Sequence, residues 1–352
     1  MRVSKAVTQE ISVPELDVLL EHFRQMINYC IRVAIDKNIT SRFKIQNEVY
    51  YGLRDEYHTH YILTAVEKAS TILKNYRRSK SENPNTEEPY VTKPHASIPY
   101  LKIRDGQLHV PIRPRKWILI PLNLHMIQIL SQPGLKIGSA LLTRNRLSIS
   151  YSKEVREIEP VGHIGLDRNL DNVTLATTQG QIQRYDLSKI TLIKSRYREV
   201  KSHLKRNDVR IRMEIFGKYG RKQTNKVNQL LHRVSKDVVQ KAVANKLTIT
   251  MENIRGIRKL YRKGNGQGRD YRAKMNSWSF YELQRQIQYK ARWEGIPVIY
   301  VDARGTSSKC SICGSKIYPN GHRTLWCQNC NISMDRDVNA ARNILARGMR
   351  FR

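Results

Sequence analysis

Acidic residues are scarce in this sequence. Its 352 residues include 30 Asp and Glu against 63 Lys and Arg, which gives a formal net charge of +33. No run of about 18 uncharged apolar residues occurs, so the sequence predicts no membrane-spanning helix and no membrane partner. The first ten residues reach an acidic side chain before any apolar stretch, which argues against a secretory signal and favours a cytoplasmic protein. The hydrophobic share of 40% is still enough for a packed core.

The positive charge is unevenly distributed along the chain. Residues 189–274 hold 25 basic and 6 acidic residues, a net charge of +19 in one stretch. A solvated protein surface normally mixes charges of both signs, whereas binding phosphates and releasing their counterions favours dense positive charge. The distribution therefore predicts a nucleic-acid-binding surface in this stretch.

Cysteine is also rare, and four of the five cysteines form two C-x2-C pairs that are separated by thirteen residues. This spacing predicts a tetrahedral zinc site, because each pair can close a tight turn that aims two sulfurs at one ion. Disulfides are the alternative, but they need an oxidising compartment that nothing in the sequence indicates. The predicted ligands of this structural zinc are Cys310, Cys313, Cys327 and Cys330.

The residues around the two pairs predict a zinc ribbon. The intervening segment contains a turn signal at 319–321 between short β-prone runs. His322 is a conceivable ligand, although four thiolates already complete the site. The fifth cysteine, Cys30, lies in an apolar helical pattern and is expected to be a small core residue.

Hydrophobic periodicity predicts a helical block near the start of the chain. Helices are expected over 12–37, with Ser12 as the cap, and over 42–57 and 60–80. A polar, proline-bearing break at 81–95 ends this block. Strand patterns then continue to residue 152, with a type I′ hairpin signal at Asp105-Gly106, so the helices are inserted into a small β module.

The rest of the chain alternates strands and helices, which predicts an α/β fold. Strand patterns at 163–187 and 247–253 flank a long basic helix over 189–246. Residues 255–274 hold spaced glycines among cations and are expected to be mobile, since their spacing does not fit a nucleotide-binding fingerprint. A helix over 277–295, a strand over 296–302 and, after the ribbon, a final helix over 335–348 complete the prediction.

Acidic residues on the apolar strands are candidate metal ligands. A carboxylate inside a strand costs desolvation free energy unless it is paired or holds a cation. Asp167 interrupts one strand and Glu252 ends another, although an arginine could pair with the first and the second could merely end its strand. Together with an acid at the start of the last helix, they could hold two Mg²⁺ ions for in-line attack of water on a phosphodiester. A ribonuclease H-like nuclease needs its three acids on a strand, a second strand and a helix, in this order along the chain.

Two acids compete for the third position. Asp335 is placed to cap the final helix, whereas Asp337 lies in its first turn and can project towards the sheet. We therefore predict Asp337 as the ligand and Asp335 as the cap. Asp171 and Asn172 follow Asp167 closely and are expected to serve turn chemistry.

Four motifs occur in the order GLDRNLDNVTLAT, ITMENIRGI, TSSKCSICG and CQNCNISMDRDVNAARNIL. With them the sequence closely resembles the TnpB proteins of small prokaryotic insertion sequences, which are relatives of the type V CRISPR effectors. The motifs cover residues 160–345, and the first half resembles the family only in the order of its parts.

The resemblance implies a transposon-encoded, RNA-guided endonuclease that cuts double-stranded DNA beside a short duplex motif. The guide RNA would be transcribed from the element's end, a separate transposase would be a functional partner, and the protein would join the nucleoid when bound to DNA. Asp167, Glu252 and Asp337 would be the catalytic acids that bind Mg²⁺, and the four cysteines would bind structural Zn²⁺. The implied regions are a wedge-like β module at 1–10 and 96–155, a helical recognition insert at 11–95, a RuvC-like nuclease at 160–304 and 334–352, and a zinc ribbon at 305–333.

Two positions depart from the family pattern. Asn331 stands where glycine is common, and asparagine tolerates the left-handed conformation. Gly305 stands where a bulkier residue is usual. Some relatives have lost their acids, so a nuclease-inactive, RNA-guided DNA-binding protein is one alternative, and a transposase that performs strand transfer is another. This sequence retains all three acids, which favours cleavage.

Overall fold

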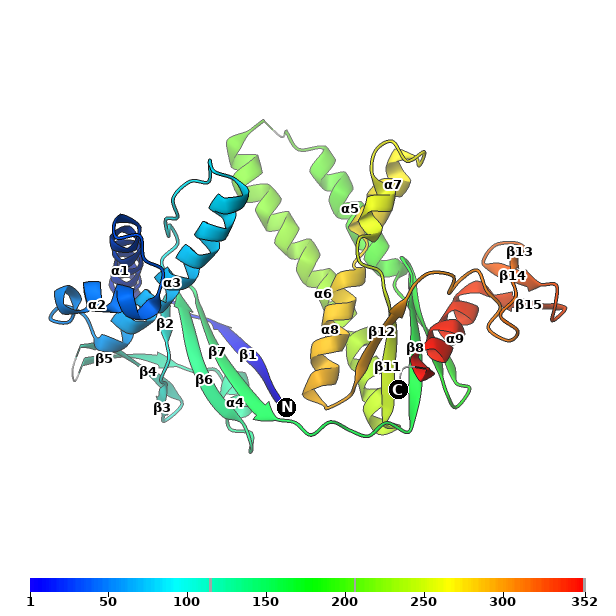
Figure 1. Cartoon of the computed structure of the whole chain (residues 1–352), viewed down its shortest axis with the longest axis horizontal. Coiled ribbons are helices and arrows are strands. Elements are labelled where there is room, and N and C mark those ends of the chain that lie inside the picture. The colour runs from blue at the N-terminus through cyan, green and yellow to red at the C-terminus, as the bar shows by residue number, and fades with distance from the viewer. Residues whose placement is uncertain (114–115, 206, 351–352) are drawn as a thin grey trace. The chain divides into compact units, whose positions relative to one another are not determined.

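The chain divides at residue 154. The structure is a computed structural model that describes residues 1–113, 116–205 and 207–350; one unit is Arg2–Glu154 and the other is Val155–Arg352 with Met1 (Figure 1). The end of the predicted nuclease segment, residues 351–352, therefore lies outside the described residues, as do 114–115 of the predicted β module and 206 of the predicted basic helix. No helix within the described ranges has the length and apolar character that a membrane span requires.

The unit Arg2–Glu154 is built on a four-stranded sheet with the order β1-β7-β6-β2. Strand β1 pairs antiparallel with β7 along its full length, and three helices occupy the connection from β1 to β2. A second sheet with the order β3-β4-β5 follows. The elements are β1 (Arg2–Glu10), α1 (Leu16–Asp36), α2 (Arg42–Leu53), α3 (Thr59–Glu82), β2 (Ala96–Ile98), β3 (Lys102–Arg104), β4 (Gln107–Arg113), β5 (Lys116–Pro121), α4 (Leu124–Leu130), β6 (Lys136–Thr143) and β7 (Arg146–Glu154).

Local sequence signals explain most of this unit. Asp105 and Gly106 have φ of 50° and 69°, as a type I′ turn requires, and they join β3 to β4, so the predicted hairpin is confirmed. Cys30 is fully buried in α1, which confirms it as a core residue. The predicted cap Ser12 was wrong, because residues 13–15 form a turn and α1 begins only at Leu16.

The unit that starts at Val155 is built on a five-stranded sheet with the order β10-β9-β8-β11-β12. The neighbours β10, β9 and β8 are antiparallel, whereas β8, β11 and β12 are parallel. The elements are β8 (Gly162–Arg168), β9 (Asn172–Thr177), β10 (Ile182–Asp186), α5 (Ser188–Ser202), a π-helical turn (Ile211–Ile215), α6 (Phe216–Ala244), β11 (Leu247–Asn253), a 3-10 helix (Ile257–Tyr261), α7 (Arg269–Ser277), α8 (Phe280–Trp293), β12 (Val298–Asp302), β13 (Tyr318–Pro319), β14 (Thr324–Cys327), β15 (Ile332–Asp335) and α9 (Arg336–Met349).

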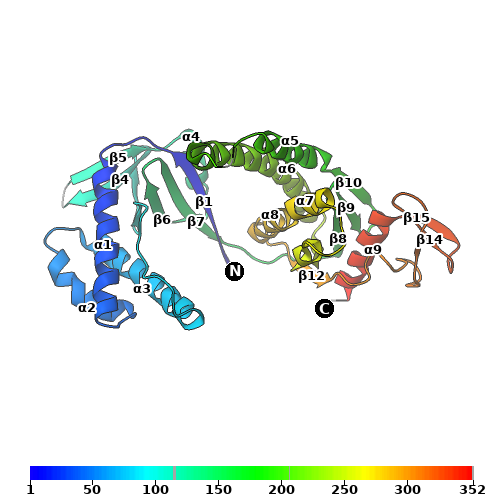
Figure 2. The same ribbon diagram turned by 90° about the horizontal axis from the view of Figure 1, so that it is seen from above.

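The predicted basic helix over 189–246 is two helices. Helix α5 ends at Ser202, and the Asp208 carboxylate accepts the backbone N–H of Ile211 at 3.0 Å where the next helical segment starts. Helices α5 and α6 then lie side by side (Figure 2), and Tyr197 and Tyr219 pack edge to face between them. Residues 255–274, expected to be mobile, contain the 3-10 helix and most of α7, so their backbone is more regular than predicted.

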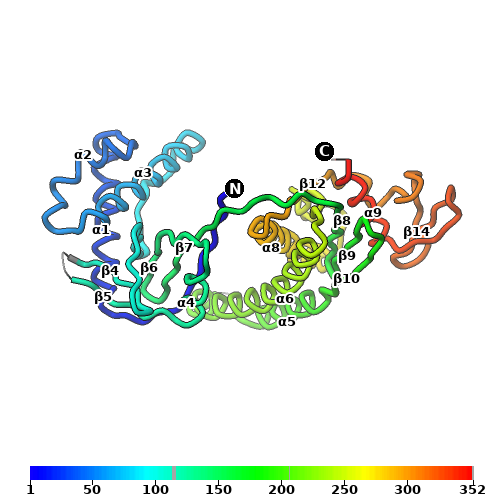
Figure 3. Tube along the Cα trace, turned by 90° about the horizontal axis from the view of Figure 1, so that it is seen from below, coloured from blue at the N-terminus to red at the C-terminus, as the bar shows by residue number. Residues whose placement is uncertain are grey.

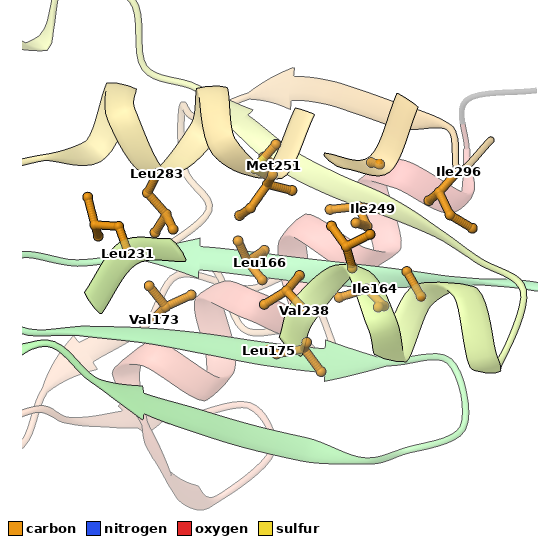
Figure 4. Packing of buried hydrophobic residues seen from close by; sticks show 14 of the residues in the cluster. Ile164, Leu166, Val173, Leu175, Leu231, Val238, Ile249, Met251, Leu283 and Ile296 are labelled. Carbon is orange, nitrogen blue, oxygen red and sulfur yellow. The ribbon is translucent and has the colours of Figure 1, made fainter. Parts of the chain in front are cut away.

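The two faces of the central sheet pack against different helices. Alternate strand residues such as Ile164, Leu166 and Met251 pack against α6 and α8 in the main core (Figure 4). The residues between them face the opposite way, towards α9, because successive strand side chains point to opposite faces. A Cβ built on Gly165 would lie 2.2 Å from the carbonyl oxygen of Ala341, and one on Gly348 would lie 2.1 Å from the hydroxyl of Thr250. Glycine therefore allows α9 to lie directly on β8 and β11, as Figure 3 shows for β8.

Gly165→Ala is expected to lower the free energy of unfolding by about 1–3 kcal/mol or more, because the added methyl group meets backbone atoms that cannot move aside. Gly220→Ala is the matched control, since Gly220 lies in α6 with open space around its Cα and alanine favours the helix. Chemical denaturation of both variants measures the difference. Equal stabilities of the two variants would show that α9 does not pack this closely.

Candidate functional site

Asp167 and Glu252 occupy matching positions on neighbouring parallel strands. Leu166 pairs with Met251 in the register of β8 and β11, so the next residue of each strand lies beside the other. Since the core residues Leu166 and Met251 face α6 and α8, the next residues, Asp167 and Glu252, both face α9. The sheet therefore brings two of the three predicted acids to one edge.

Asp335 and Asp337 lie at the start of α9, and Asp335 is the helix cap, as predicted. The Asp335 carboxylate caps the helix by accepting the backbone N–H groups of Asp337 and Val338, each at 2.9 Å. Burial acts to raise the pKa of Asp335, but the hydrogen bond from Arg184 and those backbone N–H groups outweigh it, so the pKa lies below its ordinary value. Asp337 is 1% exposed and points inward.

Two asparagines connect Asp167 with Asp337. Asn169 donates to Asp167 Oδ2 at 2.6 Å, and Asn172 donates to Asp337 Oδ2 at 3.1 Å. The two amides also contact each other at 3.4 Å. The sequence alone predicts turn chemistry for Asn172 and indicates no role for Asn169. The signal was present, since both are polar residues in the apolar run that contains Asp167.

The mutual proximity of these groups appears in the pKa of Asp167. Burial raises this pKa most, and the charges of Glu252 and Asp337 raise it further, while the hydrogen bond from Asn169 lowers it. The result is a pKa of about 7 instead of the ordinary 3.8. The pKa of Asp167 therefore depends on the charges of both other acids.

Arginines surround Asp337. Arg323 from the ribbon lies 3.2 Å from Asp337 Oδ2, and Arg184 from β10 lies 3.7 Å from the same atom. Arg184 also binds Asp335 at 2.7 Å, so it joins the cap to the buried acid. Asp337 Oδ1 is buried and accepts no hydrogen bond from the described residues. Arg336 Nε lies 3.7 Å from this oxygen, so Oδ1 has a cationic neighbour but no hydrogen bond.

Glu252 is fixed by a residue of the loop that leads into the ribbon. The buried hydroxyl of Thr306 donates to Glu252 Oε1. Burial raises the pKa of Glu252, while Thr306 and the charge of Arg168 act in the opposite direction. Asn343 of α9 holds this loop by donating to the carbonyl oxygen of Thr306 at 2.7 Å. The same loop thus contacts both the acid and the last helix.

Arg168 is a buried cation behind the acidic edge. Its guanidinium donates to the backbone oxygen of Glu252 at 2.5 Å and to Gln284 of α8 at 2.8 Å. Burial lowers the pKa of Arg168 to about 10, and the charge of Glu252 partly compensates. Arg168 therefore ties β8 to β11 and α8 directly beneath the acids, a role that the sequence did not reveal.

The four cysteines gather as predicted, with their sulfurs all within 4.8 Å of one another. The Sγ atoms of Cys310 and Cys330 are 3.9 Å apart, and those of Cys313 and Cys327 are 3.5 Å apart. Four thiolates at about 2.3 Å from a tetrahedral zinc ion would be about 3.8 Å apart, so the residues fit this metal. All four cysteines are free of disulfides.

The ribbon that carries the zinc ligands is a small three-stranded sheet with the order β13-β14-β15. Asn331 has φ of 54°, in the left-handed conformation expected at this knuckle. His322 is not part of the metal-binding cluster among the described residues, which consists of the four cysteines alone.

The three acids do not form a preassembled site for a single ion, since the cysteines are the sole cluster of that kind in the described ranges. Their chemistry nevertheless fits Mg²⁺, which prefers carboxylate oxygens. Asp337 Oδ1 accepts no hydrogen bond from the described residues, and the pKa of Asp167 is raised first by burial and then by the negative charges of Glu252 and Asp337, which a cation would offset. The chemistry of these carboxylates therefore fits a divalent cation.

Two family models match the chain. The model described as "Cas12f1-like, TNB domain" matches residues 280–344, which include the ribbon and most of α9, and the model "Uncharacterized protein MJ0013 family" matches residues 19–107. The first model thus covers all four cysteines and Asp337.

Curated relatives carry related names. TnpB-like protein MJ0751 of Methanocaldococcus jannaschii is 30% identical over 259 residues, which cover 69% of this chain and 91% of that protein. The CRISPR-associated endodeoxyribonuclease Cas12f1 of Sulfoacidibacillus thermotolerans is 36% identical over 116 residues, 32% of this chain and 25% of that protein. The putative RNA-guided DNA endonuclease InsQ of Escherichia coli is 37% identical over 89 residues, 23% of this chain and 22% of that protein.

Among solved structures, a Cas12f1–sgRNA–target DNA complex matches with a TM-score of 0.55 and 14% identity, covering 93% of this chain and 82% of that chain. CasPhi-2 bound to crRNA matches with a TM-score of 0.52 and 9% identity over 97% of each chain. At these identities the likeness concerns the fold.

Cys327→Ser is expected to remove zinc from the ribbon and to lower the thermal unfolding temperature, because three thiolates and a hydroxyl bind zinc less tightly than four thiolates do. Elemental analysis of the purified protein measures the metal. Cys30→Ala should keep one zinc per chain, since Cys30 lies in the core of the other unit. A Cys327→Ser variant with a full equivalent of zinc would contradict the assignment.

Asp167→Asn is expected to stabilise the protein strongly at pH 8 without Mg²⁺ and to stabilise it less at pH 5. Because the folded pKa of about 7 lies above the unfolded value of 3.8, the folded state holds this proton more tightly. Wild-type stability therefore falls as the pH rises from about 4 to about 7, whereas asparagine cannot ionise. Thermal unfolding of the zinc-loaded protein measures both shifts. Identical shifts at the two pH values would refute the raised pKa.

Proposed function

Because the chain belongs to the TnpB family, we propose that it is a metal-dependent, RNA-guided DNA endonuclease. It hydrolyses phosphodiester bonds in a double-stranded target that matches the guide and lies next to a short duplex motif. The main support is that Asp167 and Glu252 end neighbouring parallel strands on the face covered by α9, whose first turn carries Asp337.

A RuvC-like, ribonuclease H-like fold for the second unit is part of this proposal. It is supported by the sheet order β10-β9-β8-β11-β12, in which three antiparallel strands continue into a parallel pair. It is further supported by the fold likeness to the Cas12f1 complex. In that fold, two strands and one helix supply the acids.

In the proposed chemistry, hydrogen bonds from neighbouring side chains hold the metal-binding carboxylates in place. Asp167, Glu252 and Asp337 would bind two Mg²⁺ ions, which supply positive charge to the scissile phosphate and lower the pKa of bound water. Asn172 and Thr306 hold the carboxylates of Asp337 and Glu252 by the hydrogen bonds described above. Such fixed ligands lower the reorganisation that the reaction requires.

The other regions would bind nucleic acid. Their proposed boundaries are those predicted from the sequence. We assign the β module at 1–10 and 96–155 and the helical insert at 11–95 to guide-RNA binding and duplex-motif reading. The nuclease spans 160–304 and 334–352 around the ribbon. The guide would be transcribed from the element's end, and the protein would act on prokaryotic cytoplasmic DNA beside a separate transposase.

Asp167→Ala, Glu252→Gln and Asp337→Asn are each expected to reduce cleavage at least about a hundredfold, because losing one metal ligand removes several kcal/mol of transition-state stabilisation. RNA and DNA binding should persist. Single-turnover cleavage of a guide-matched duplex measures the effect, with Asp270→Asn as the control at an exposed acid. Wild-type protein that binds the guided target without cutting would support the inactive alternative, and strand transfer without a partner transposase would support the other.

RNA that co-purifies from the native host is expected to be one defined species that ends in spacer-like sequence. Guidance requires such an RNA, since base pairing supplies the specificity that backbone contacts lack. Sequencing the bound RNA tests this. A random sample of cellular RNA would contradict guidance.

A further inference from the structure

A basic groove lies beside Glu252 and takes no part in the site as described so far. Its volume is about 930 Å³, and it is formed between the end of β12, the loop that leads into the ribbon and the C-terminal end of α9. The charged residues that line it are Asp302, Arg304, Lys309, Arg347 and Arg350.

Most of the positive charge in this groove is unneutralised. The side chains of Arg304, Lys309 and Arg350 are exposed and make no ion pair or hydrogen bond within the described ranges. Arg347 has a structural role instead, since its guanidinium donates to the backbone oxygens of Asp302 and Arg304. Three free cations on one concave surface form a site for an anion with several charges.

The remaining lining residues leave room for such a ligand. The carboxylate of Asp302 is engaged locally, because it accepts the backbone N–H of Arg304 at 3.0 Å. Gly305 has φ of 81° and no side chain, so the groove is open where the sequence departs from the family pattern. The groove thus includes Gly305, a position at which the sequence departs from the family pattern.

The groove is continuous with the acidic edge. Val301, which lines the groove, pairs with Glu252 in the register of β11 and β12. Thr306, which fixes the Glu252 carboxylate, lies between the lining residues Gly305 and Ser308. The charge of Arg347 also lowers the pKa of Glu252. A chain of phosphates in the groove would therefore run next to this acid.

We infer that the groove binds the phosphate backbone of the DNA strand that is cut, on the Glu252 side of the acidic edge. This inference rests on the proposed nuclease function and adds the path of the substrate strand to it. Free cations hold the backbone without reading bases, as a nuclease that takes its specificity from a guide requires. Guide RNA carries the same phosphates, so the experiment must distinguish DNA binding in the groove from RNA binding.

The test measures how salt affects binding of a fluorescent, mixed-sequence single-stranded DNA to the zinc-loaded protein saturated with RNA, without Mg²⁺. Each phosphate contact contributes a slope of about −0.7 in log K against log salt concentration. The triple variant Arg304→Gln, Lys309→Gln, Arg350→Gln is expected to bind DNA more weakly and to reduce the magnitude of the slope by about 2.

Single variants control for charge and folding. Arg350→Gln should reduce the slope by about 0.7, whereas Arg342→Gln, which removes the same charge from an exposed position of α9 outside the groove, should leave it unchanged. Arg350 lies at the exposed end of the helix, so this variant keeps the test informative if the triple variant does not fold.

Unchanged DNA slopes in both groove variants would overturn the inference. A reduced slope for an RNA probe of the same sequence, with DNA binding unaffected, would also overturn it and would assign the groove to the guide. If the groove variants lose DNA contacts while the wild-type protein never cuts a guide-matched target, the groove stands and the nuclease proposal fails.

Discussion

The fold is constrained by negative charge that is buried at the end of its central sheet. Asp167 and Asp337 are almost inaccessible to solvent, and Glu252 lies beside Asp167 on the next strand. Burying carboxylates costs free energy, and the pKa of Asp167 near 7 records that cost. The chain has a net charge of +33 and yet buries these acids. A cation bound between them would offset the free-energy cost of burying their charge.

The neighbouring elements serve to hold these acids. Helix α9 lies directly on β8 because Gly165 has no side chain, and this contact brings the first turn of α9 to the end of the strand. Arg168 ties β8 to β11 and α8 from beneath. The loop before the ribbon fixes Glu252 through Thr306 and is itself held by Asn343. The cysteine cluster begins at Cys310, close to this loop, so a zinc ion bound there would stabilise a segment that is hydrogen-bonded to Glu252.

The basic residues fall into two groups with different roles. Arg184 and Arg323 are paired with the acids, and Arg347 is paired with backbone oxygens, so these cations hold the site together. Others, such as Arg304 and Arg350, have no partner among the described residues and are available to phosphates. The net charge of the sequence therefore overstates the positive charge that can reach nucleic acid.

Elements that depend on neighbouring residues could be predicted from the sequence alone. The cysteine spacing gave the metal cluster, Asp105-Gly106 gave the hairpin, and Asp335 gave the cap of α9, because each depends on residues that are close in the chain. Polar residues in apolar strands also identified the candidate acids. Tertiary structure decided which groups meet, since Asn172, Arg184 and Thr306 reach the acids from distant positions. It also decided that cations without a partner among the described residues gather beside Glu252, because that outcome depends on how α9, the sheet and the ribbon loop pack.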